Sequence, residues 1–187
     1  MIVKQQGILP LLLFWVASTV CDSHIKPSEF LCNEVERGRL RNQAENLCKR
    51  MNNCSDLTKP LSPEIRLPDA SIHKETWEKI HFKDRMAEVL QSLRNLVQDV
   101  EAARESMQSG CGSSLLEGLE HNARNYQGIL THPSVAVEVE RLHPGETTRP
   151  PIIQKSSSNI KQILRHFDNL LKGKLELLMM ELDVSCH

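Results

Sequence analysis

The short connection Gln108-Ser-Gly-Cys-Gly-Ser113 joins two long segments of helical periodicity. Apolar side chains recur every three or four residues from about residue 76 to 108, and the same spacing continues from about 113 to 131. A connection this short cannot return along the length of a helix, so the two helices must run antiparallel. Ser114 and Glu117 have the spacing of a capping box at the start of the later helix.

Two further helices are predicted, over about 33–52 and 158–183, and the first opens with Asn33 as its N-cap. Long, proline-containing connections separate these helices from the central pair, and a long connection can leave consecutive helices parallel. The sequence therefore predicts an all-α protein, a four-helix bundle with the up-up-down-down topology of long-chain cytokines and two long crossover loops. A three- or four-helix up-and-down bundle with loose linkers is the alternative.

A small strand pair is also predicted between the two crossover loops. Val135, Val137 and Val139 alternate with polar residues, which is the period of a half-buried strand. We expect these valines to pair with Glu64-Ile-Arg-Leu67 of the first loop across the bundle.

Composition indicates one packed domain. The chain has 187 residues, of which 25% are charged and 40% are hydrophobic, and this balance excludes intrinsic disorder. Aromatic residues make up only 4%, which argues against a β-sandwich or barrel. The formal net charge of -1 gives no indication of a nucleic-acid partner or of insertion into a membrane, and we expect a monomer.

The N-terminal segment has the order of a secretory signal peptide. Lys4 precedes an apolar run from Ile8 to Val16, and the small residues Ala17-Ser-Thr19 follow. We predict a signal peptide over residues 1–20, with cleavage between 18 and 23, and a secreted domain over 21–187. A buried N-terminal helix is the alternative, and the run is too short for a transmembrane helix.

The predicted topology selects two disulfides among six cysteines. Cys32 opens the first helix and Cys186 closes the last, so the two lie at one end of an up-up-down-down bundle. Cys54 and Cys111 lie at the opposite end, which predicts the bonds Cys32–Cys186 and Cys54–Cys111. The pairing of the remaining two is left open: Cys21 and Cys48.

No catalytic residue, cofactor site or metal site is predicted. The chain lacks a serine nucleophile elbow, a phosphate-binding glycine loop and a His-Glu-Xaa-Xaa-His motif, and its cysteines lack zinc-ligand spacing. One glycosylation sequon occurs, Asn53-Cys54-Ser55. The sequence thus favours a binding protein over an enzyme.

The last predicted helix has the features of an interface. Gly173 costs about 1 kcal/mol relative to alanine within a helix, and its place between Lys172 and Lys174 would let another chain approach the backbone. Leu177, one turn later, would add an apolar anchor. Packing of Gly173 against a neighbouring helix is the alternative. The first helix carries a basic cluster, which an ordinary solvated face would also explain: Arg37, Arg39 and Arg41.

Two motifs carry a resemblance to a known family. Val100-Glu-Ala-Ala-Arg104 is followed after six residues by Cys111-Gly-Ser-Ser-Leu-Leu116, and the last helix contains Asn169-Leu-Leu-Lys-Gly-Lys-Leu-Glu-Leu177. Both resemble the erythropoietin/thrombopoietin family of four-helix cytokines, and the similarity extends from about Cys32 to Cys186. Glu176 departs from the family pattern, which favours a basic residue there, and the long glycosylated tail of some mammalian members has no counterpart in this chain.

The resemblance implies a hormone that bridges two class I cytokine receptor chains and activates their associated Janus kinases. It also implies the two disulfides that topology selects. Arg39 is the best match on the weaker second face, beside Arg37 and Arg41. A secreted amphipathic-helix carrier of lipid is the alternative from another class. The implied high-affinity receptor face lies on the last helix and comprises Asn169, Lys172, Gly173, Lys174 and Leu177.

Overall fold

The structure is a computed structural model that describes residues 30–55, 57–147 and 154–183. The predicted signal peptide lies outside these residues. Within the described ranges, no helix has both the length and the apolar composition that crossing a membrane requires.

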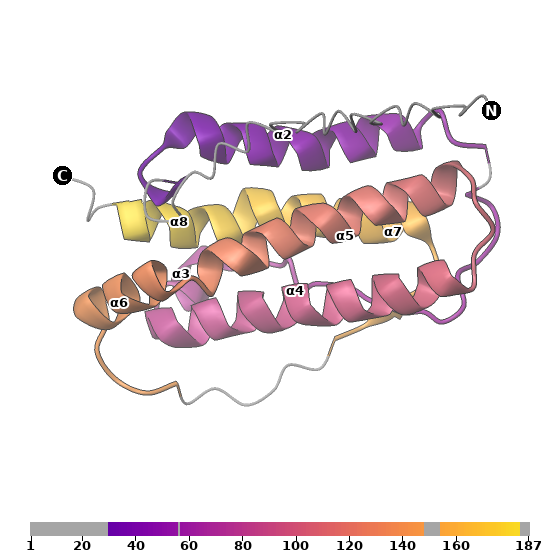
Figure 1. Cartoon of the computed structure of the whole chain (residues 1–187). Coiled ribbons are helices and arrows are strands. Elements are labelled where there is room, and N and C mark those ends of the chain that lie inside the picture. The colour runs from indigo at the N-terminus through magenta and orange to yellow at the C-terminus, as the bar shows by residue number, and fades with distance from the viewer. Residues whose placement is uncertain (1–29, 56, 148–153, 184–187) are drawn as a thin grey trace, which may run out of the picture.

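Four long helical segments dominate the fold (Figure 1). The first three are α2 (Glu34–Met51), α4 (Phe82–Glu105) and α5 (Cys111–Leu130). The fourth is continuous, because the π-helical turn η1 (Leu171–Leu175) joins α7 (Ile160–Leu170) to α8 (Glu176–Asp183). The smaller elements are α3 (Lys74–Trp77), α6 (Pro133–Leu142) and the strands β1 (Ile65–Arg66) and β2 (Ser156–Ser157).

The predicted topology is confirmed. In Figure 1, α2 and α4 run in one direction, whereas α5 and the α7–α8 segment run in the other. Each up-running helix contacts down-running ones: α2 lies against α5 and α7, and α4 lies against α5 and α8. The chain therefore forms an up-up-down-down four-helix bundle with two long crossover loops.

Side chains cap three of the four long segments at their starts. The Asn33 side chain accepts a hydrogen bond from the Glu36 N–H at 3.2 Å, as its position predicts, and Asn159 does the same for Gln162 at 3.2 Å. At the start of α4, the Nδ1 atom of His81 accepts from the Lys83 N–H at 3.4 Å.

The second helix begins later than the sequence predicts. Its apolar periodicity extends back to about residue 76, but the chain forms only the short α3 there and then turns before His81 caps α4. Trp77, which the periodicity assigns to the long helix, is buried at the end of α3. The start at residue 76 is wrong because Trp77 packs into the core from the crossover loop.

The predicted capping box of the third helix is also wrong. α5 begins at Cys111, with Gly110 as an N-cap that makes no side-chain hydrogen bond, so Ser114 already lies inside the first turn. The Ser114 Oγ accepts a hydrogen bond from Arg50 of α2 at 3.0 Å. The helix starts one turn early, at the cysteine that is bonded to Cys54.

The predicted strand at Val135–Val139 is a helix. Pro133 occupies the first turn of α6, and His132 caps it. Val135 and Val139 are buried one turn apart while Val137 is 68% exposed, so the apolar period is four rather than two. The first-loop strand does form as β1, but its antiparallel partner is β2, with Ile65 opposite Ser157. This ladder joins the two crossover loops to each other.

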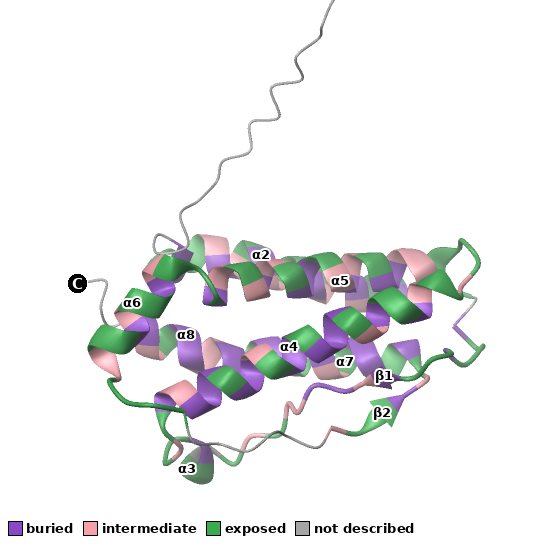
Figure 2. Ribbon diagram, turned by 60° about the horizontal axis from the view of Figure 1, so that its bottom comes forward, coloured by how far each residue is buried: buried purple, intermediate pink, exposed green. Residues whose placement is uncertain are grey.

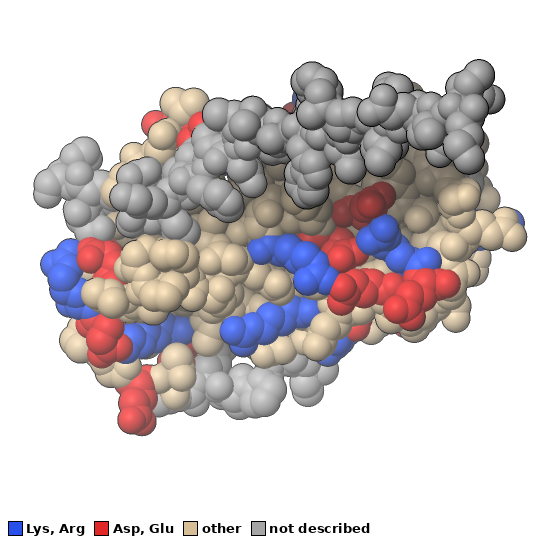
Figure 3. All heavy atoms as spheres, viewed as in Figure 1, with Lys and Arg blue, Asp and Glu red and all other residues tan. Residues whose placement is uncertain are grey.

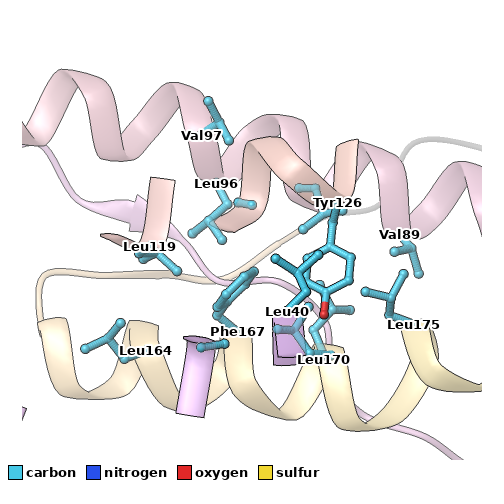
Figure 4. Close-up of a cluster of buried hydrophobic side chains, with 14 of the residues drawn as sticks. Leu40, Val89, Leu96, Val97, Leu119, Tyr126, Leu164, Phe167, Leu170 and Leu175 are labelled. Atoms are coloured by element: carbon cyan, nitrogen blue, oxygen red, sulfur yellow. The ribbon is translucent and has the colours of Figure 1, made fainter. Parts of the chain in front are cut away.

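Leucine is the commonest residue in the core, in keeping with the low aromatic content. Figure 4 shows Phe167 of α7 among leucines contributed by the other long helices, with Tyr126 of α5 beside them. Figure 2 shows that each long helix buries one face and exposes the opposite one. Helices α2 and α5 approach closely at Gly118, where an added Cβ would lie 2.6 Å from a methyl carbon of Leu47.

The substitution Phe167→Ala tests the core. We expect it to lower the free energy of unfolding by about 3–5 kcal/mol, because Phe167 is 1% exposed and its removal leaves a cavity. Urea denaturation followed by circular dichroism measures the change. Val137→Ala, at an exposed valine, should change stability by less than about 0.5 kcal/mol. A similar small loss for Phe167→Ala would contradict the packing described.

Candidate functional site

The last helix presents two different environments at the predicted high-affinity face. Asn169 and Lys172 are exposed, whereas Lys174 is buried. Gly173 and Leu177 are half-buried, and Leu177 packs against the core. The five residues therefore do not form one exposed surface.

Lys174 is an internal residue, which corrects the expectation that its ammonium group meets a receptor. Its Nζ lies 2.5 Å from the Glu88 Oε1 of α4 and 2.9 Å from the Asp69 Oδ2 of the first crossover loop. The ammonium group also lies 4.7 Å from the centre of the Trp77 ring. Because only 3% of the Lys174 side chain is exposed, its charge is used within the protein to hold the crossover loop against α4 and the last helix.

Gly173 also serves the fold. A Cβ atom added at this position would lie 2.8 Å from the Cδ1 of Ile72, so the first crossover loop covers the glycine. The close approach that the sequence predicts is present, but the approaching segment belongs to the same chain. The alternative interpretation expected a neighbouring helix to pack against Gly173. The segment that does so is instead the first crossover loop.

The cluster around Lys174 continues into a second ion pair, which is only partly buried. Arg85 of α4 lies 2.8 Å from Glu181 of α8, and the Arg85 side chain is only 6% exposed. Its guanidinium carbon lies 6.0 Å from the centre of the Trp77 ring and 5.4 Å from that of Phe82. The indole of Trp77 thus lies near two cations, Lys174 and Arg85, both of which have carboxylate partners.

The pKa of Asp69 reflects this cluster. Burial acts to raise the pKa of the Asp69 carboxyl, but hydrogen bonds from Lys174 and from the Ser71 backbone outweigh burial and hold the pKa below its usual range. Asp69 is therefore ionised at neutral pH and pairs with Lys174.

The exposed part of the predicted face is made by Asn169 and Lys172. Lys172 donates to Asp168 at 2.9 Å, and this hydrogen bond raises the pKa of Lys172, so the ammonium group stays charged. Beside them, Ser71 and His73 of the first crossover loop are exposed on either side of Ile72. These loop residues were not predicted, because sequence alone does not show where a crossover loop lies.

A shallow polar groove extends this surface along α7. Lys161 and Arg165 are exposed there and form no ion pair with any residue that the structure describes. Their i, i+4 spacing, continued by Asn169, is the signal that could have indicated a basic row on one helix face. The groove is lined by Asn159, Lys161, Gln162, Arg165, His166 and Asn169.

The three arginines of α2 do not form one patch. Arg37 is 7% exposed and donates to the Leu31 carbonyl oxygen, which removes it from the predicted second face. Arg41 pairs with Glu176 of α8 at 3.0 Å. The acidic residue that departs from the family pattern at position 176 therefore has a cationic partner within the chain. Arg39 is the exposed member, with 65% of its side chain accessible, and it pairs with Glu36 at 2.9 Å.

Arg39 lies on the side of α2 that faces α5. Gln43, one turn later on the same face, is the hydrogen-bond partner of Asn122 of α5 at 3.4 Å. Arg41, by contrast, points to α8. The exposed arginine and the exposed residues of α7 therefore lie on opposite sides of α2.

Charges on the α4–α5 side largely neutralise one another. Figure 3 shows Lys and Arg side chains interspersed with Asp and Glu on the face that Figure 1 presents. Arg124 of α5 contacts both Glu101 and Glu120, and Arg104 of α4 also contacts Glu120. This side offers no excess of one sign to a partner.

One of the two predicted disulfides is confirmed. Cys54 is bonded to Cys111, with their Cα atoms 5.8 Å apart. Cys32 is disulfide-bonded as well, but Cys186 and Cys21 lie outside the described residues, so the bond Cys32–Cys186 stays a prediction. Cys48 is a free thiol whose sulfur lies 3.8 Å from the Leu164 carbonyl oxygen, and burial raises the pKa of that thiol.

No metal centre is found in the part of the chain that the structure describes, where no three His, Cys, Asp or Glu side chains cluster suitably.

Comparison with known protein families places the chain in a family of known description. The family described as erythropoietin/thrombopoietin matches residues 29–187, which is most of the chain. No individual curated protein matches the sequence significantly. Members of the matched family are cytokines that act through class I cytokine receptors.

The substitution Lys174→Ala tests the internal role of this lysine. We expect the free energy of unfolding to fall by about 3–5 kcal/mol, because Glu88 would keep a buried charge without this cation. Lys172→Ala removes an exposed lysine two residues away and should cost less than about 1 kcal/mol. Thermal unfolding of both variants measures the difference, and equal stability of the two would contradict the burial of Lys174.

Proposed function

Because this chain belongs to the erythropoietin/thrombopoietin family of cytokines, we propose that it is a secreted hormone of the thrombopoietin type. It binds and dimerises a class I cytokine receptor and thereby stimulates the production of megakaryocytes and thrombocytes. The observation that carries the proposal is the motif Val100-Glu-Ala-Ala-Arg104 with Cys111-Gly-Ser-Ser-Leu-Leu116, which resembles thrombopoietin in sequence and in spacing. The hormone acts by binding alone, without catalysis or a cofactor.

The mechanism requires two separate faces on one rigid bundle. The high-affinity face combines Asn169 and Lys172 of the last helix with the crossover segment Ser71–His73. Lys172 supplies an exposed cation for a receptor carboxylate, and Leu177 supplies part of an apolar contact. Lys174 and Gly173 support this face from beneath, since Asp69 and Ile72 hold the loop in place through them.

The second, weaker face lies on α2 around Arg39. Its position on the α5-facing side of α2 supports the proposal, because a second receptor chain can approach there without contacting the α7 surface. Each face binds one receptor chain, and the rigid bundle holds the two chains at a fixed separation. Their proximity then brings the receptor-associated kinases together.

An erythropoietin-like hormone of red-cell production is the second candidate. The motif Asn169-Leu-Leu-Lys-Gly-Lys-Leu-Glu-Leu177 supports it equally well, because both hormones of the family end their last helix in this way. The two candidates share fold, secretion and mechanism, and they differ in the receptor that responds.

Cells that carry either receptor distinguish the two candidates. Purified, oxidised protein should stimulate proliferation of cells that bear the thrombopoietin receptor and leave cells that bear the erythropoietin receptor unchanged. Both receptors should be taken from the species that supplies the sequence, and each matched hormone serves as the positive control. A response through the erythropoietin receptor alone would replace the first candidate by the second, and silence from both would defeat the proposal.

Charge reversal separates the two proposed faces. Lys172→Glu should weaken binding to the first receptor chain about ten-fold or more, which corresponds to roughly 1.4 kcal/mol. Arg39→Glu should leave that binding unchanged but reduce signalling, because it affects only recruitment of the second chain. Surface plasmon resonance with the receptor ectodomain measures the first effect, and a cell response curve measures the second. Lys59→Glu, at an exposed lysine outside both faces, is the matched control. Unchanged binding by Lys172→Glu would contradict the first face.

A further inference from the structure

We propose that Asn53 carries an N-linked oligosaccharide and that the sugar is transferred before the Cys54–Cys111 disulfide closes, so that closure limits the fraction of chains modified. Asn53 begins the sequon Asn53-Cys54-Ser55, whose central residue is a bonded cysteine. The proposal rests on the secretion proposed above, because the modification occurs in the secretory pathway.

The position has room for a bulky sugar. Asn53 follows Asn52, the C-cap of α2, and both Asn53 and Ser55 are exposed. Within the described residues, no hydrogen bond engages the Asn53 carboxamide. Figure 1 shows that α2 ends beside the α4–α5 connection, at the end of the bundle opposite to α6 and α8. Arg39 lies fourteen residues earlier, about 21 Å along the helix, so a sugar at Asn53 leaves the proposed second face open.

The folded backbone holds the sequon in a tight turn. The N–H groups of Asn52, Asn53 and Cys54 donate to carbonyl oxygens three residues earlier, at 3.2, 3.1 and 3.2 Å. The disulfide then fixes Cys54 beside the first residue of α5. A transferase that must enclose the Asn53 carboxamide and the Ser55 hydroxyl together needs this segment open. The chain therefore offers a good acceptor only while Cys54 is still a thiol.

The two reactions use different groups and different partners. In the transfer, a bond forms between the Asn53 Nδ2 and the anomeric carbon of an oligosaccharide carried on a polyisoprenyl pyrophosphate. The bond from that carbon to the pyrophosphate oxygen breaks, the amide nitrogen loses one proton, and the polyisoprenyl pyrophosphate leaves. In the closure, the thiols of Cys54 and Cys111 lose two protons and two electrons to a disulfide-carrying oxidoreductase of the same compartment.

The competition predicts that occupancy of Asn53 depends on a residue outside the sequon. Expression of the full chain in mammalian cells, followed by enzymatic removal of N-linked sugar, should shift part of the wild-type protein to lower mass. Asn53→Gln should abolish the shift. Cys111→Ser leaves the sequon intact but removes the bond, and the modified fraction should rise. Cys48→Ser removes the free thiol instead, and the modified fraction should stay as in the wild type.

Occupancy is measured on all chains in the cell lysate as well as in the medium, so a folding defect of Cys111→Ser does not obscure the result. Secreted wild-type protein and Cys111→Ser that both lack sugar would overturn the modification. If Asn53 is occupied to the same extent in the wild type and in Cys111→Ser, whether completely or partially, then disulfide closure does not compete with sugar transfer. A parallel chain with a known signal peptide in place of residues 1–20 separates the two proposals. Sugar on that chain, with none on the native one, shows failure of the predicted leader and leaves the assignment of Asn53 standing.

Discussion

A buried ammonium group is stable only when carboxylates neutralise its charge, and this requirement holds the first crossover loop against the rest of the bundle. Lys174 forms ion pairs inside the protein with both Glu88 of α4 and Asp69 of the loop. With Asp69 held there, Ile72 covers Gly173, and the surface beside the last helix is completed by loop residues. The π-helical turn that contains Lys174 lies at the centre of this arrangement, as such turns often do at functional positions.

The helices and their directions could be predicted because periodicity and connection length are local features of the sequence. The disulfide Cys54–Cys111 then followed from the topology. Local pattern was insufficient where two periods fit the same residues. Valines at 135, 137 and 139 satisfy a strand by alternation and a helix through the i, i+4 pair, and the helix start at His132 and Pro133 accompanies the helical outcome. Trp77 fits the helical period of α4, yet it is buried at the end of the separate short helix α3.

The candidate site was predicted in part. Lys174 falls within the buried stripe of its helix, between Leu171 and Leu178, but its partners lie 86 and 105 residues away in the sequence. Such partners cannot be identified from one sequence, so a lysine at this position looks like a surface residue. The spacing of the three arginines of α2 indicates by itself that they do not share one face. Residues two apart on a helix point in nearly opposite directions, so Arg37, Arg39 and Arg41 could not form one patch.

The ladder between β1 and β2 also bears on the order in which the molecule assembles. Ile65 and Ser157 are paired although they are 92 positions apart in the sequence, and α4, α5 and α6 lie between them. Contacts of such large sequence separation are entropically costly until the helices between them have packed. We therefore expect the ladder to form late in folding. Once formed, it makes the two crossover loops a single strap, so a force applied to one loop is transmitted to the segment that leads into the last helix.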